Sequence, residues 1–316
     1  MKRILIAPIR AAATGVLYPA ELFLRKACRT TVRPCFIIGA PRSGTTLFFE
    51  ALVTRYNFAY FSNFAHRLPY TPVAATMIAR NAIARRTSSF SSKYGHVAGW
   101  VAPNEGGWIW NRWIPERCHL TEHDLHGRRV GEMQSTVSGV ATALRSPFVS
   151  KNVMHSVHMR LLDAAFPGCK FIHIVRNKVD NIRSLVRLRE SGARLRPPEN
   201  WVSVKPLGWE RYAYEHYVIQ CSAQAFLTDR NIELDREIIG KDRVFQVKYE
   251  EFCRDPNHAM DNLRDFLITG GIVVQERIKL PNSFVISTGH RLPNGYEQLI
   301  EQFVVEHTSL PGLEGK

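Results

Sequence analysis

The sequence predicts an α/β fold in which a parallel sheet is flanked by helices. Short apolar runs alternate along the chain with segments of helical periodicity, an order typical of such folds. A glycine-rich turn links the first apolar run to the first of these helices. With 316 residues, of which 45% are hydrophobic, the chain can bury a sizeable core. Ligands of such sheets bind at the carboxyl ends of the strands, so the site is expected there.

The apolar runs and helical segments can be assigned in chain order. The run at 35–38 ends at Gly39, as a buried parallel strand would, and Pro167 and Gly168 stop a later helix. The expected strands are 35–38, 57–61, 148–150, 170–175 and 244–247. The expected helices are 45–55, 157–166, 179–189, 209–227 and 256–267.

Two stretches lie outside this alternation. Residues 62–146 hold several prolines and four of the six tryptophans. We expect them to form a helical insertion after the second strand, with loops that cover the site. Residues 1–34 are expected to be an N-terminal helical extension, and residues 35–316 a single domain.

The N-terminal extension favours an amphipathic helix over residues 4–24. Lys2 and Arg3 precede an apolar stretch, but Arg10 interrupts it and no convincing cleavage site follows, so a signal peptide is not predicted. No apolar run reaches the length of a membrane span. Packing of this helix on the domain is the preferred interpretation, and contact with a bilayer surface is the alternative. The prediction is a cytoplasmic protein, with peripheral membrane association as the second possibility.

The charge balance indicates an anionic ligand. The chain has 42 Lys and Arg residues against 28 Asp and Glu, a net charge of +14. Such a surplus attracts anions of many kinds. No nucleic-acid module accompanies it, so we expect a small anion in a cleft rather than nucleic acid. The six cysteines are far apart and form no C-x-x-C pair, as expected for reduced thiols.

The sharpest motif is the segment from Gly39 to Thr46, Gly-Ala-Pro-Arg-Ser-Gly-Thr-Thr, between an expected strand and helix. Glycines let successive backbone N–H groups point into one concavity, and the helix N-terminus adds partial positive charge. Arg42 can neutralise an oxyanion, and Thr45 and Thr46 can donate hydroxyl hydrogen bonds. The spacing matches the ATP-type phosphate loop, but Thr45 stands where that loop has its lysine. An ordinary kinase or NTPase is therefore disfavoured.

The run from Pro41 to Thr46 resembles the loop of the sulfotransferases that use 3′-phosphoadenosine 5′-phosphosulfate (PAPS). The resemblance implies a P-loop type sheet with no metal requirement and PAPS as the sulfuryl donor. It implies that Arg42 is catalytic and stabilises the bridging oxygen as the sulfuryl group leaves. By the same resemblance, the donor's 5′-phosphosulfate is held by Arg42, Ser43, Gly44, Thr45 and Thr46.

A second anion site is expected at Arg176 and Ser184. Arg176 follows the run 170–175, and Ser184 lies eight residues later, in the second turn of the next helix. A guanidinium fork and a hydroxyl can thus meet at one phosphate. The arrangement resembles the family's site for the 3′-phosphate, the group that distinguishes PAPS from ATP. The alternative is an unrelated surface arginine and helical serine.

Two further residues are assigned to the nucleotide by resemblance. The segment Val247-Lys-Tyr249-Glu-Glu-Phe, followed by Asp255 and Pro256, resembles a family segment that places Tyr249 near the adenine. A tyrosine that only closes a strand edge is the alternative. Arg291 belongs to a C-terminal segment that loosely resembles the family's closing loop over the nucleotide.

Three residues are candidates for the general base that deprotonates the acceptor. His66 follows the second expected strand, where other members of the family place a catalytic Glu. His155 lies two residues beyond the position at which cytosolic members carry a catalytic His. Glu105 belongs to the insertion. The order of preference is His66, His155 and then Glu105.

The resulting prediction is transfer of a sulfuryl group from PAPS to a hydroxyl or amine. The acceptor is a small molecule, a carbohydrate or a lipid, and the sequence does not choose among them, nor does it predict an oligomeric state. The alternatives are a nucleotide kinase or NTPase and a noncatalytic nucleotide-binding P-loop protein. The cluster of Cys118, His119, His123 and His126 matches no standard zinc spacing, so no metal is predicted.

Overall fold

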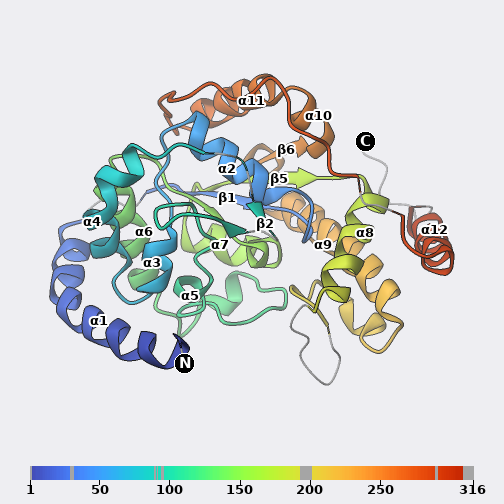
Figure 1. The fold of residues 1–316 in the computed structure, drawn as a ribbon, viewed down its shortest axis with the longest axis horizontal. Coiled ribbons are helices and arrows are strands. Elements are labelled where there is room, and N and C mark those ends of the chain that lie inside the picture. The colour runs from blue at the N-terminus through green and yellow to red at the C-terminus, as the bar shows by residue number, and fades with distance from the viewer. Residues whose placement is uncertain are drawn as a thin grey trace.

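A parallel sheet with strand order β4-β1-β5-β6 lies at the centre of the protein, with helices on both of its faces (Figure 1). The computed structural model describes residues 2–28, 32–88, 90, 92–93, 96–192, 201–288 and 291–308. The strands are β1 (Cys35–Ile38), β4 (Val149–Lys151), β5 (Lys170–Val175) and β6 (Val244–Lys248). All three strand pairings are parallel, with Cys35 opposite both Val149 and Lys170. The predicted α/β fold with a parallel sheet flanked by helices is confirmed.

Alternate residues of β1 enter different cores, which explains why this strand is apolar throughout. Cys35 and Ile37 pack with α2 (Thr45–Arg55), α10 (Tyr249–Arg254) and α11 (Pro256–Thr269). Phe36 and Ile38 pack on the opposite face with α6 (Val130–Leu144) and α7 (Met159–Ala165). Because successive side chains of a strand point to opposite faces, a sheet covered on both sides needs apolar residues at every position.

A third apolar cluster joins α8 (Lys178–Glu190), α9 (Tyr217–Ile239) and α12 (Asn294–Thr308) beside the sheet. The helix expected at 209–227 begins later and ends later than predicted. A 3-10 turn covers Trp209–Tyr212, and α9 starts after His216, whose side chain accepts a hydrogen bond from the N–H of Val218. The helix expected at 157–166 corresponds to α7, which begins at Met159 after a 3-10 helix at Val153–Val157.

The segment expected to form the second strand, 57–61, makes only a single bridge. Ala59 pairs with Phe148, while the N–H of Asn57 donates to the carbonyl of Gln275 at 2.8 Å. The segment thus divides its backbone hydrogen bonds between the chain around Phe148 and the chain at Gln275, so it does not form a continuous β-ladder with either.

The insertion after this segment is helical, as expected. It contains α3 (Asn63–Arg67), α4 (Pro72–Ala84), α5 (Gly107–Trp110), α6, a short hairpin of β2 (Ser92–Lys93) and β3 (His96–Val97), and a 3-10 turn at Glu122–Leu125. The N-terminal helix α1 (Lys2–Ala27) packs against α4 and α6. No helix in the described ranges is both long and apolar enough to cross a membrane.

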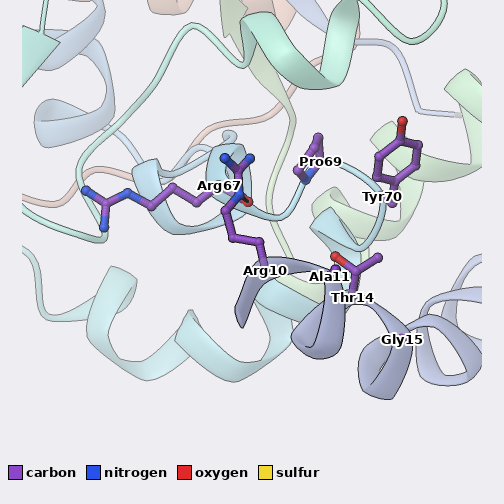
Figure 2. A pocket seen from close by; sticks show the side chains of 7 residues that line it. All are labelled: Arg10, Ala11, Thr14, Gly15, Arg67, Pro69 and Tyr70. Atoms are coloured by element: carbon purple, nitrogen blue, oxygen red, sulfur yellow. Dashed lines mark hydrogen bonds between the residues drawn. The ribbon is translucent and has the colours of Figure 1, made fainter. Parts of the chain in front are cut away.

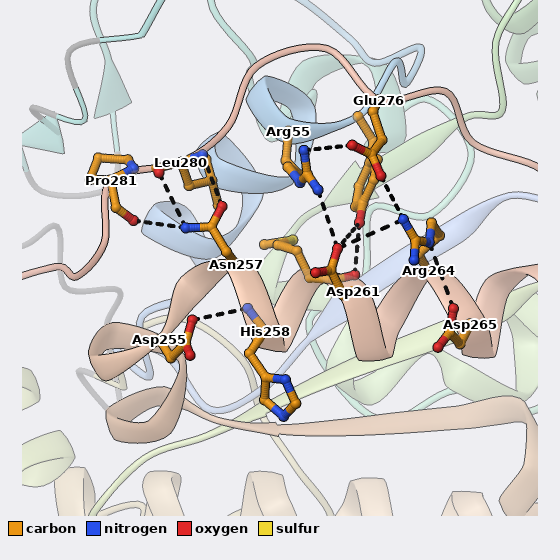
Figure 3. A network of polar contacts seen from close by, with 12 residues as sticks. Arg55, Asp255, Asn257, His258, Asp261, Arg264, Asp265, Glu276, Leu280 and Pro281 are labelled. Atoms are coloured by element: carbon orange, nitrogen blue, oxygen red, sulfur yellow. Dashed lines mark hydrogen bonds and ion pairs between the residues drawn. The ribbon is translucent and has the colours of Figure 1, made fainter.

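An ion-pair network fixes the chain that follows α11 (Figure 3). Arg55, at the end of α2, pairs with Glu276 at 2.9 Å and with Asp261 of α11 at 3.2 Å. Arg264 also pairs with Glu276. Asn257 donates to the carbonyls of Leu280 and Pro281, both at 3.2 Å. These contacts hold the segment that runs on to Ser287, which lies in the site described next.

Candidate active site

The phosphate loop connects β1 to α2 at the carboxyl end of the sheet. Gly39 and Gly44 have φ of 149° and 94°, and Arg42 has a φ of 70°. A Cβ at Gly39 would lie 2.6 Å from the carbonyl oxygen of Ile174, so only glycine fits there. The left-handed conformation of Arg42 is uncommon for a residue with a side chain, and such strain is concentrated at functional sites.

Neighbouring elements hold the loop in place. The Ser156 hydroxyl accepts from the N–H of Gly39 and donates to its carbonyl, both at 3.0 Å. Asn181 of α8 donates to the carbonyl of Pro41 at 2.8 Å. Arg176 donates to the carbonyl of Arg42 at 2.8 Å. The loop backbone is therefore preorganised, with its concave side left for an anion.

The predicted second anion site lies beside the loop. The Nε of Arg42 donates to the hydroxyl of Ser184 at 3.1 Å, and the Arg176 guanidinium donates to the carbonyls of Arg42 and Ser287. Arg176 is buried, and its Nε has no hydrogen-bond partner among the described residues. The buried hydroxyl of Ser43 is also unpartnered within the described ranges. Buried polar atoms of this kind are costly unless a ligand satisfies them, so the cluster fits an anionic ligand.

Tyr249 lies directly against the phosphate loop. A Cβ at Gly44 would come within 2.3 Å of the Tyr249 ring, so the ring and the loop are in close contact. The guanidinium carbon of Arg176 lies 4.9 Å from the centre of this ring. Burial raises the pKa of Tyr249 to about 12, so its hydroxyl stays protonated at neutral pH. The Tyr249 ring thus lies beside both the phosphate loop and Arg176. Its contact with the adenine of a bound nucleotide stays a prediction.

A cavity of about 430 Å³ opens over these residues. The loop lines one side through Arg42, Gly44, Thr45 and Thr46, and Arg176 and Tyr249 contribute to its wall. Apolar side chains line it as well, from Leu47, Phe90, Val153 and Leu188. Glu105 and Lys151 also line the cavity, and they form an ion pair with each other.

Of the three candidate bases, Glu105 is the one that lines this cavity. Its segment is fixed because the N–H of Asn104 donates to the carbonyl of Phe61 at 2.8 Å. Gly106 follows with a φ of 64°, and a Cβ there would lie 2.7 Å from the Phe61 ring. Glu105 came last in the order of preference drawn from the sequence, and it is the candidate that the structure places at this cavity.

The two histidines lie elsewhere. His155 is buried in the core, where its Nε2 bonds to the Ser150 hydroxyl at 3.0 Å and its ring packs edge-on against Phe36 and Trp110. Burial holds the pKa of His155 well below its usual range, so it stays neutral. His66 stacks on Trp108 with ring centres 4.6 Å apart and does not line the cavity.

Arg291 is not among the residues that line the cavity. Arg291 is exposed, and its carbonyl accepts from Arg187 of α8 at 3.3 Å, while its neighbours 289 and 290 fall outside the described residues. His119 pairs with Asp235 at 3.0 Å. Among the described residues, no group of three or more His, Cys, Asp or Glu side chains is placed to bind a metal ion.

Lys151 is a site residue that the sequence reasoning did not select. It ends β4, its side chain is only 6% exposed, and its ammonium group faces Glu105. The available signal was its place at the carboxyl end of a buried strand next to β1.

Fold and site together define a P-loop protein with a basic cleft at the carboxyl edge of a parallel sheet. The chain belongs to the sulfotransferase family, whose model matches residues 34–269. It is therefore an enzyme, a sulfotransferase.

Similar proteins agree with this assignment. Omega-hydroxy-beta-dihydromenaquinone-9 sulfotransferase Stf3 of Mycobacterium bovis and of Mycobacterium tuberculosis are each 22% identical over 283 residues, covering 80% of this chain and 68% of theirs. The crystal structure of sulfotransferase STF9 from Mycobacterium avium has a TM-score of 0.53 at 16% identity, covering 96% of this chain and 76% of that one. That likeness shows the fold.

Proposed function

We propose that this enzyme transfers a sulfuryl group from PAPS to a hydroxyl group of an apolar, lipid-like acceptor. The observation that carries the donor is the convergence of Arg42, Ser184 and Arg176 beside a preorganised phosphate loop. Two adjoining anion sites suit a nucleotide with a 5′-phosphosulfate and a 3′-phosphate better than they suit ATP. The loop has no lysine after Gly44, which further disfavours the kinase alternative.

The proposed roles follow from position. The N–H groups of the loop, with Ser43, Thr45 and Thr46, hold the 5′-phosphosulfate, and Arg42 stabilises the charge that develops on the leaving phosphate. Arg176 and Ser184 bind the 3′-phosphate, and the Tyr249 ring packs near the adenine. Lys151, a buried residue that also lines the cavity, would neutralise the sulfuryl oxygens.

Glu105 is proposed as the general base. The acceptor oxygen forms a bond to sulfur, the bond from sulfur to the bridging phosphate oxygen breaks, and 3′,5′-bisphosphoadenosine leaves. The acceptor proton passes to the Glu105 carboxylate. Because Lys151 pairs with this carboxylate, Glu105 is oriented before the acceptor binds.

The acceptor class rests on the cavity and on the relatives. Leu47, Phe90, Val153 and Leu188 give the cavity an apolar wall. The Stf3 proteins carry in their name an omega-hydroxylated menaquinone, which is a hydroxyl on a long apolar chain. A terminal hydroxyl at the end of an apolar chain would fit such a wall while its oxygen meets Glu105.

Calorimetry with 3′,5′-bisphosphoadenosine, AMP and ATP tests the donor. We expect tight binding that depends on the 3′-phosphate, and equal binding of ATP would refute the donor assignment. Radiolabelled PAPS, offered with an omega-hydroxylated isoprenoid quinone, a simple phenol and a monosaccharide, tests the acceptor. Preferential labelling of the phenol or the sugar would contradict the lipid-like acceptor while leaving the donor assignment intact.

A further inference from the structure

Helix α1 packs on the domain through Ala13, Leu17 and Leu24. Two of its polar side chains, Glu21 and Arg25, also bond to the domain. Glu21 is buried and accepts a hydrogen bond from the N–H of Ala74 at 2.8 Å, in the first turn of α4. Arg25 pairs with Glu132 of α6 at 3.5 Å. Burial raises the pKa of Glu21 to about 7. Its carboxyl oxygen can accept the hydrogen bond from Ala74 whether the group is ionised or protonated, so this contact fixes α1 on the domain in both states.

The outward face of α1 is apolar. Between residues 11 and 23 its exposed residues bear no charge: they are Ala11, Ala12, Gly15, Val16, Tyr18, Pro19, Ala20, Leu22 and Phe23. At 100° per residue they form one continuous arc of the helix. Val16 is 79% exposed and Phe23 is 73% exposed. A contiguous apolar patch on the outside of a helix marks an interaction surface.

This face lies in the strongly basic part of the chain. Residues 1–104 contain fourteen Lys and Arg residues against two acidic residues, a net of +12 out of the +14 of the whole protein. Both acids, Glu21 and Glu50, are buried, and Glu50 pairs with Arg86 at 3.1 Å. Glu132, which α6 brings against α1, is already engaged by three arginines, Arg25, Arg112 and Arg129. The described surface of this third of the chain therefore offers cations without exposed carboxylates.

A basic pocket adjoins the apolar face (Figure 2). It has a volume of about 520 Å³ and lies between α1 and the turn after α3. Ala11 and Gly15 belong both to its lining and to the exposed arc, and Arg10 and Arg67 line it too. The Nε of Arg10 donates to the carbonyl of Arg67 at 2.8 Å, and the Arg67 side chain is exposed.

We propose that α1 docks the enzyme on an anionic lipid bilayer, with the exposed arc in the interface and the exposed cations Lys26 of α1, Arg67 of α3 and Arg80 of α4 over the headgroups. An uncharged apolar face within a cationic surface is the composition that binds anionic interfaces. A second copy of this chain is disfavoured, because a two-fold contact through this face would bring the exposed cations beside it in the two copies together. The proposal does not depend on the identity of the donor or the acceptor.

Vesicle co-sedimentation tests it. The full chain is mixed with vesicles of phosphatidylcholine alone or with phosphatidylglycerol added. We expect binding to the anionic vesicles that weakens as salt is raised. The double variant Val16→Asp with Phe23→Asp should bind at least tenfold more weakly. The matched control is Val305→Asp on α12, where Val305 is 66% exposed, and it should bind within twofold of the wild type. Figure 1 shows α12 and α1 at opposite ends of the molecule.

A second variant guards against a folding defect. Arg67→Gln removes an exposed cation at the pocket and leaves the backbone carbonyl that Arg10 uses, so it should weaken anionic-vesicle binding about threefold at low salt. Thermal unfolding identifies any variant that fails to fold. Wild-type binding that is equal for both vesicle types, or a double variant that binds like the wild type, overturns the proposal. So does a stable wild-type dimer in light scattering that Phe23→Asp dissociates, which would assign the face to a second copy.

Discussion

Replacement of Arg176 by alanine tests the 3′-phosphate site most directly. The guanidinium is buried, donates to the carbonyls of Arg42 and Ser287 and has an Nε without a partner in the described part of the chain. A charge-assisted hydrogen bond contributes roughly 1.5–3 kcal/mol, and about 1.4 kcal/mol corresponds to a tenfold change in affinity. Arg176→Ala should therefore weaken the binding of 3′,5′-bisphosphoadenosine by about ten- to hundredfold. Ser184→Ala, which removes a neutral bond of about 1 kcal/mol, should weaken it about fivefold.

The assay is calorimetry of the wild type and both variants with 3′,5′-bisphosphoadenosine and with AMP. AMP lacks the 3′-phosphate, so its affinity should change by less than about twofold to threefold. Arg183→Ala is the matched control, because Arg183 lies on the same helix as Ser184 but pairs with Glu297 outside the cavity. If Arg176→Ala weakens the binding of both nucleotides by the same factor, Arg176 only supports the loop through its bond to the Arg42 carbonyl, and its assignment to the 3′-phosphate is wrong.

Three other perturbations test the remaining parts of the site and the core. Glu105→Gln should lower turnover by about 100-fold or more, since general bases contribute roughly 10²–10⁴, with bisphosphoadenosine affinity unchanged; normal turnover would exclude the proposed base. Gly44→Ala places a Cβ against the Tyr249 ring at a residue whose φ is 94°, so it should lower the free energy of unfolding by about 1–3 kcal/mol in a denaturant titration. Gly131→Ala is the control, because the space around Gly131 is open, and it should be neutral or stabilising. Burial lowers the pKa of His158 to about 4, so below pH 6.5 the unfolded chain binds a proton at this residue that the folded protein does not bind. The free energy of unfolding should therefore fall by on the order of 3 kcal/mol between pH 6.5 and 4 because of this group. The variant His158→Gln should show a weaker dependence of stability on pH over this range.

The phosphate loop could be predicted from sequence because its main determinants are local. Gly39, Arg42 and Gly44 lie within one strand–turn–helix unit, although Ser156 and Asn181 from other elements also hold the loop. Arg176 and Ser184 belong to one strand–helix unit, and in the structure each contacts Arg42, through its carbonyl and its side chain respectively, while their role at a 3′-phosphate stays a prediction. Parallel strands then align the two units at the same edge of the sheet.

The acceptor side could not be predicted in the same way. Glu105 meets Lys151 across 46 positions of chain, through a segment fixed to Phe61 by backbone bonds. No local pattern encodes such a contact. His155 looked suitable because it follows a strand, but a 3-10 turn directs its ring into the aromatic core. The polar contacts of α1 were not predicted for a similar reason, since its partners Ala74 and Glu132 belong to distant elements.

This division between local and distant determinants bears on how acceptor choice could change within such a fold. The loop, Arg176, Ser184 and Tyr249 contact one another through the sheet and α8, without help from the insertion. The insertion supplies Glu105 and Phe90, and it contacts β4 through the pair of Glu105 with Lys151 and the hydrogen bond from Trp110 to Ser150. A remodelled insertion could therefore alter the proposed acceptor wall while the proposed donor site stays intact, provided that a carboxylate still reaches Lys151. The same insertion contributes α4 and α6, on which α1 rests, so the proposed membrane face and the acceptor wall are parts of one structural unit.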